Sequence, residues 1–135
     1  MKLDASFWIC VGAILALLCV LFGAAGAHWL EALSDVDSKD TYETAVRFQM
    51  FHSIALLSIG LILNSQFTIN RLMGYSPIFI LIGTIVFCGS LYLISLSSLK
   101  WLGAVAPIGA VFLMLGWLML GLSVLTETRR RSTRE

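Results

Sequence analysis

The chain has 135 residues, of which 59% are hydrophobic and only 13% are charged, and its formal net charge is +1. A soluble domain is typically about 45–50% apolar and about 25% charged, so this composition excludes an ordinary soluble domain. It also excludes a nucleic-acid-binding protein, because the basic residues gather only at the C-terminus and no aromatic residues stand between them.

Four long stretches contain no Asp, Glu, Lys or Arg: residues 5–30, 48–70, 72–99 and 101–126. Each exceeds the roughly 20 residues that a helix needs to cross about 30 Å of hydrocarbon, and a charge at the centre of such a helix is costly. The sequence therefore predicts an all-α, membrane-embedded, up-down-up-down four-helix bundle. We expect a single domain over residues 1–135, with helices at about 5–30, 41–64, 76–98 and 102–125.

In the first predicted helix, Ala25-Gly26-Ala27 resembles the small-x-small pattern of a signal-peptide cleavage site. The uncharged run before it begins at residue 5, which makes it longer than the about 7–15 residues of a signal-peptide core. Asp4 also offsets the positive charge of Lys2. We therefore expect a retained helix.

Local signals place the starts of the other helices. Asp40 followed by Glu43 predicts a capping box at the second helix, and Glu43 with Arg47 predicts an i,i+4 ion pair. Pro77 is expected near the first turn of the third helix, where its missing N–H costs little. Pro107, about two turns into the fourth span, predicts a kink or an irregular turn.

Small residues recur at intervals that suit close helix packing. Gly109 and Gly116 are seven residues apart, and Gly83, Ser90 and Ser97 repeat with the same spacing. Membrane helices associate through such close approach rather than through a hydrophobic driving force. The candidate packing positions are Gly23, Gly26, Gly60, Gly83, Gly109 and Gly116.

The basic residues predict the orientation. With four spans both termini lie on one side, together with Lys2, Arg71, Arg129, Arg130, Arg131 and Arg134. The opposite side holds Lys39, Arg47 and Lys100. Because positive charge stays inside, we expect a cell inner-membrane protein with both termini cytoplasmic, in contact with the lipid bilayer.

Polar residues within the spans gather toward the predicted outer side. The candidate polar cluster consists of His28, Glu31, Tyr42, Gln49, His52, Ser90 and Tyr92. The first two helices meet at the outer loop, so His28 is expected to contact the second helix near Gln49 and His52. The cluster has two readings: a hydrogen-bonded clasp between helices, or a proton or substrate site, since intramembrane ionisable groups are functional candidates.

Cofactor chemistry is not predicted. The chain has only two histidines, whereas a structural zinc takes four ligands, so we expect no metal and no cofactor. No nucleophile–base pair, phosphate loop or carboxylate pair lies within a span, so we do not expect an enzyme.

Several motifs together resemble one family. Gly23-Ala24-Ala25-Gly26-Ala27-His28 resembles the GAFGAH motif of the YgdD-like family of small inner-membrane proteins, and Tyr42-x-x-Ala45-x-x-Phe48-Gln49-x-x-His52 resembles its second motif. Phe87-Cys88-Gly89-Ser90-Leu91-Tyr92 resembles its FSGSLY motif, and Ala106-Pro107-Ile108-Gly109-Ala110 with Gly116-Trp117 resembles its TPIGG…GW ending. The resemblance implies four membrane helices in a bacterial inner membrane and supplies no activity.

The chain departs from these motifs at four positions. Ala25 stands for the usual Phe, Cys88 for a Ser, Ala106 for a Thr and Ala110 for a Gly. A role that needs a hydroxyl group beside Pro107 is thereby weakened.

Two functions remain open from the sequence. The first is a non-enzymatic accessory, scaffold or assembly component with a membrane-protein partner or a second copy of itself. The alternative is a small transporter or channel subunit with an outer-side polar site at His28, Gln49 and His52. A redox or quinone-associated protein is a more distant third.

Overall fold

The computed structural model describes residues 4–32, 36–65, 70–97 and 99–132, and it is built of helices. They are α1 (Ala5–Ala32), α2 (Val36–Asn64), α3 (Arg71–Leu96), the short 3-10 helix η1 (Lys100–Ala104) and α4 (Ala106–Ser132). Each of the four α-helices is long and apolar enough to cross a membrane. The predicted all-α fold with four membrane-capable helices is confirmed.

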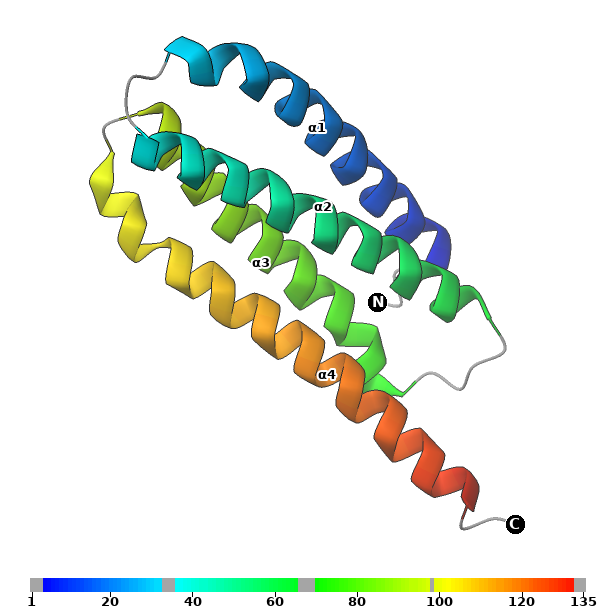
Figure 1. Ribbon diagram of the computed structural model, residues 1–135. Coiled ribbons are helices and arrows are strands. Elements are labelled where there is room, and N and C mark those ends of the chain that lie inside the picture. Colours follow the sequence, from blue (N-terminus) through cyan, green and yellow to red (C-terminus); the bar gives the residue numbers. More distant parts are fainter. Residues whose placement is uncertain (1–3, 33–35, 66–69, 98, 133–135) are drawn as a thin grey trace.

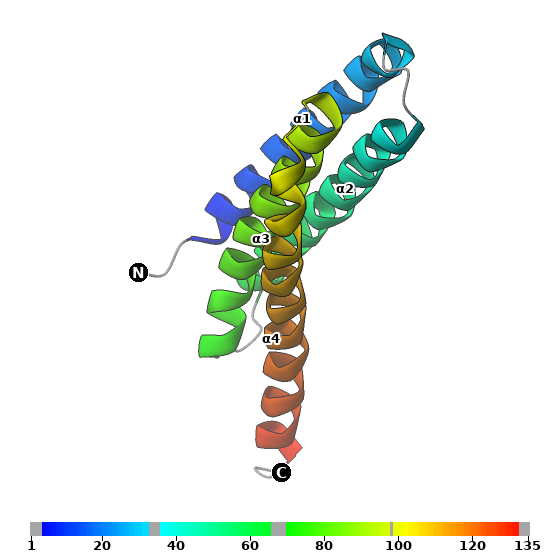
Figure 2. The ribbon, with the colours of Figure 1, turned by 90° about the vertical axis from the view of Figure 1, so that its left-hand side faces the viewer.

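Consecutive helices run in opposite directions and pack side by side in chain order (Figure 1). α1 packs on α2, α2 on α3 and α3 on α4, whereas the end helices α1 and α4 share no extensive interface among the described residues. In a second view, the last turns of α4 project beyond the other helices (Figure 2). The arrangement is therefore an open row of helices in which α3 lies between α2 and α4.

α2 begins earlier than its sequence predicts. It starts at Val36, so Asp40 lies inside the helix and the predicted capping box is wrong. Asp37 stands in the first turn instead, where a carboxylate complements the helix dipole. The predicted ion pair is confirmed: Arg47 donates to Glu43 at 2.7 Å.

The two prolines occupy different positions from those expected. α3 begins at Arg71 because Asn70 caps it, its side-chain oxygen accepting the Met73 N–H at 3.0 Å. Pro77 therefore lies inside α3 rather than at its start. The irregular turn predicted near Pro107 is present as η1, and α4 starts afresh at Ala106, so that Pro107 falls in its first turn.

Glycines mark the closest approaches between helices. A Cβ atom added at Gly109 would collide with the backbone of Phe87, and one at Gly83 would lie 2.7 Å from the Leu113 nitrogen. Gly26, Gly60 and Gly116 are similarly crowded by the neighbouring helix, while Gly23 is only in ordinary contact. Gly12, which the spacing argument missed, would bring a Cβ to 2.8 Å from the Leu57 nitrogen.

Two glycines of α4 allow a matched test of this packing. A Cβ at Gly116 would lie 2.6 Å from Ile80 and 3.0 Å from its backbone nitrogen, whereas one at Gly121 would meet no atom within 4 Å. We expect Gly116→Leu to lower the free energy of unfolding by about 1–3 kcal/mol, the usual cost of overpacking. Gly121→Leu should leave it nearly unchanged. Unfolding in mixed micelles measures both, and equal stability of the two variants would contradict a Gly116 contact with α3.

Candidate functional site

Gln49 is the centre of a hydrogen-bonded network that joins three helices. Its side-chain nitrogen donates to the Leu15 carbonyl of α1 at 3.0 Å, and its side-chain oxygen accepts from the Tyr92 hydroxyl of α3 at 2.8 Å. Tyr42 donates to the Phe22 carbonyl at 2.7 Å, and its ring meets the Tyr92 ring edge-on at 5.1 Å between centroids. Three of the predicted cluster residues, Tyr42, Gln49 and Tyr92, are thus brought together.

The network leaves no polar atom of Gln49 without a partner. Within the described part of the chain, every buried side-chain nitrogen or oxygen has a hydrogen-bond partner. Hydrocarbon offers no water to satisfy such groups, so the bonds to Leu15 and Tyr92 set how α1 and α3 sit against α2. This arrangement is that of a clasp between helices.

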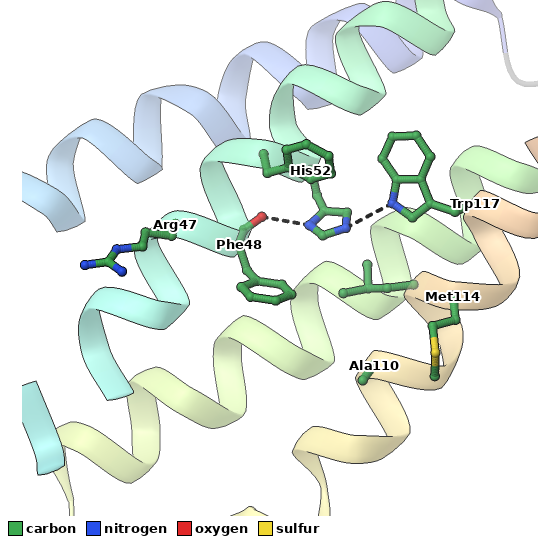
Figure 3. A pocket seen from close by; sticks show the side chains of 8 residues that line it. Arg47, Phe48, His52, Ala110, Met114 and Trp117 are labelled. Atoms are coloured by element: carbon green, nitrogen blue, oxygen red, sulfur yellow. Dashed lines mark hydrogen bonds between the residues drawn. The ribbon is translucent and has the colours of Figure 1, made fainter. Parts of the chain in front are cut away.

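His52 faces a different neighbour. Its Nδ1–H donates to the Phe48 carbonyl at 2.7 Å, and its Nε2 accepts from the Trp117 indole N–H of α4 at 3.2 Å (Figure 3). Because a carbonyl can only accept, the ring carries its proton on Nδ1. The ring also stacks on Phe48, with centroids 5.9 Å apart, and meets Phe51 edge-on at 5.2 Å.

A cleft of about 590 Å³ lies between α2 and α4 beside this pair (Figure 3). Most of its lining is apolar, with Arg47 at one end and the His52–Trp117 hydrogen bond at the other. Its lining residues are Arg47, Phe48, Phe51, His52, Ala110, Leu113, Met114 and Trp117. No sequence signal in α2 or α4 alone indicates a cleft, because it arises only when the two helices are placed over α3.

The predicted contact of His28 with Gln49 and His52 stays a prediction. Gln49 is level with Leu15 of α1, and His28 lies thirteen residues further along the same helix, or about 20 Å at 1.5 Å per residue. His52 lies sixteen residues inside α2, while His28 stands close to the end of α1. The side chains of His28 and Glu31 lie outside the described residues.

Ser90 does not join the network either. Its hydroxyl group donates to the Val86 carbonyl one turn earlier in α3. This is the local bond that serine commonly makes inside a helix.

Three residues that the sequence reasoning missed connect helices: Asn70 and Ser76 join α3 to α4, and Trp117 joins α4 to α2. Asn70 donates to the Ser123 carbonyl at 2.9 Å and to the Thr126 hydroxyl at 3.0 Å, and Ser76 donates to the Gly116 carbonyl at 2.8 Å. Trp117 is the third, as the partner of His52. The only signal for Trp117 was its place in the Gly116-Trp117 motif.

Metal ligands do not converge in the part of the chain that the structure covers. Among the described side chains, no three from His, Cys, Asp and Glu lie close enough together to hold an ion. Cys19 and Cys88 are buried as free thiols, and Cys10 is exposed on α1.

Comparison with known proteins places the chain in a family. The family model described as "Protein of unknown function (DUF423)" matches residues 22–110, which is more than half of the chain. The chain belongs to this family. The matched segment contains α2, α3 and the Tyr42–Gln49–Tyr92 network.

Individual relatives extend the match. A UPF0382 membrane protein of Staphylococcus saprophyticus is 37% identical over 113 residues, which cover 84% of this chain and 92% of the relative. The UPF0382 inner membrane protein YgdD of Escherichia coli K12 is 30% identical over 133 residues, which cover 98% of this chain and all of YgdD. No solved structure matches. The predicted resemblance to the YgdD-like family is confirmed, and the chain is a membrane protein.

The Gln49–Tyr92 bond can be tested by a double-mutant cycle. We expect Tyr92→Phe and Gln49→Leu each to destabilise the protein, with a coupling of about 0.6 kcal/mol and at most about 1.7 kcal/mol, the range for polar contacts between membrane helices. Ser90→Ala on the same helix is the control, because its hydroxyl group bonds only within α3. Strictly additive effects of Tyr92→Phe and Gln49→Leu would contradict the contact.

Proposed function

We propose that this protein is a non-catalytic accessory, scaffold or assembly component of a bacterial inner membrane. One observation carries the proposal: Gln49, Ser76 and Tyr92, polar side chains within the described spans, are used to join helices to one another. Catalysis needs a group within reach of a substrate that is free to exchange a proton, and Gln49, Tyr92 and Tyr42 are committed to neighbouring helices. The inner-membrane location is supported by the relative YgdD, an inner membrane protein.

The outward faces of the end helices are the surfaces available to a partner. Among the described residues, the main interface of α1 is with α2 and that of α4 is with α3. Leu17 of α1 and Leu118 of α4 are 60% and 55% exposed, and neither contributes to the packing core. These faces contact lipid in isolation, and a scaffold would use them to bind another membrane protein or a second copy.

The transporter alternative loses part of its support. Gln49 points to α1 and α3, whereas His52 points to α4, so the two do not line a common path. A liposome flux assay addresses this function, and visible absorption of the purified protein addresses a redox role. We expect neither flux nor a visible chromophore.

The proposed orientation places both termini in the cytoplasm. It is supported by six basic residues on the side of the termini against three on the opposite side. A cysteine at position 38, from Ser38→Cys, should react with an impermeant thiol reagent in intact cells, and Ser132→Cys should not. The native cysteines provide a low background because all three lie within the spans. The reverse labelling pattern would overturn the orientation.

The scaffold role itself can be tested by photo-crosslinking in the native membrane. A photoreactive residue at position 118, exposed on α4, should give one adduct of defined mass with a second membrane protein. The same residue at position 56 should give none, because Leu56 is fully buried. The proposal would be contradicted if a photoreactive residue at position 118, and likewise one at position 17 on α1, formed adducts with lipid alone. An adduct of twice the chain mass would identify self-association.

A further inference from the structure

The α2–α4 cleft opens sideways, in the direction that faces lipid in a membrane. Phe51 and Met114 on its two walls are both more than half exposed. Its volume of about 590 Å³ lies within the roughly 300–1,000 Å³ of typical ligand pockets. Because an apolar cleft in hydrocarbon is not left empty, the question is whether a lipid chain or another helix fills it.

The depth of the cleft matches one leaflet of the bilayer. Asn64 ends α2, and Thr126 lies level with the start of α3 through its bond to Asn70, so both mark the same membrane boundary. Arg47 precedes Asn64 by seventeen residues, or about 25 Å, whereas Trp117 precedes Thr126 by nine residues, or about 13 Å. In about 30 Å of hydrocarbon, the cleft therefore runs from near the opposite headgroup layer to the midplane.

Both ends of the cleft favour a lipid over a helix. The His52–Trp117 hydrogen bond joins α2 to α4 at the inner end, so a helix crossing the whole bilayer would have to continue past this bridge. An acyl chain ends at the midplane and therefore does not have to continue past the bridge. At the other end stands the exposed Arg47 guanidinium, a group with five N–H donors that suits phosphate.

We propose that this cleft binds one anionic phospholipid of the leaflet in which α2 begins. One acyl chain lies between α2 and α4 against Phe51 and Met114, and the phosphate group lies on Arg47. Glu43 holds one guanidinium nitrogen of Arg47 at 2.7 Å and weakens the attraction for the phosphate. The site is independent of the accessory role proposed above.

Quenching of Trp117 fluorescence reports on this site. The full chain with Trp29→Phe and Trp101→Phe is reconstituted in phosphatidylcholine vesicles that contain either brominated phosphatidylglycerol or brominated phosphatidylcholine at equal mole fraction. The fluorescence of Trp117 is obtained as the difference in fluorescence between this chain and the same chain with the further change Trp117→Phe. We expect the anionic lipid to quench roughly two- to fivefold more effectively, the scale of one basic residue near anionic lipid.

Variants at the headgroup end separate specific binding from general lipid contact. Arg47→Gln should abolish the preference for the anionic lipid, and Glu43→Gln should increase it. Both residues are exposed, so neither change disturbs the packing of the helices. Equal quenching by the two lipids, unaffected by Arg47→Gln, would overturn the proposal and leave only the ordinary lipid shell.

Variants at the chain end test the cleft itself. Ala110→Phe should reduce quenching by both lipids because it fills the cleft, while Val111→Phe, on the adjacent exposed position of α4 outside the lining, should not. Weak quenching that falls further as the protein-to-lipid ratio rises would show that a second copy fills the cleft. Partner crosslinking at position 118 is unaffected by these outcomes, so the two proposals fail separately.

Discussion

Close backbone approach at glycine is the constraint on which the rest of this structure depends. Lipid is as apolar as the helix surfaces, so burial of leucine against leucine gains little, and contacts at short range hold the helices together. α3 and α4 meet at glycines of both helices: Gly83 lies against Leu113, Gly109 against Phe87 and Gly116 against Ile80. The approach is close enough for the Ser76 hydroxyl group to reach the Gly116 carbonyl at 2.8 Å.

The same constraint decides where the polar groups find partners. The Tyr42 ring lies so close to Gly26 that a Cβ there would be 2.5 Å from it. This position lets the Tyr42 hydroxyl group reach the Phe22 carbonyl and brings its ring against Tyr92. Gly26 therefore leaves room for a tyrosine of α2, which explains why a glycine motif and a tyrosine motif occur in one chain.

Local patterns in the sequence predicted the helices but not their register. The spacing of the charged residues predicted four membrane-spanning helices, and the i,i+4 spacing predicted the Glu43–Arg47 ion pair. The depth of His52 relative to the first helix could not be predicted, because register is set by the fit of distant groups, such as Gly60 against Ile9. No periodicity within one helix encodes such a fit. The Trp117–His52 bond was missed for the same reason, since it joins residues 65 positions apart.

The position of α3 explains why the candidate site is a cleft and why a histidine lies at its end. α2 and α4 both pack on α3 and run in the same direction, so they are held apart from one another (Figure 1). Their side chains meet across this gap at His52 and Trp117. Neutral imidazole carries a donor and an acceptor on opposite sides of a rigid ring. His52 can therefore satisfy the Phe48 carbonyl with one nitrogen and receive the Trp117 indole N–H with the other, and it bridges two helices that do not pack directly.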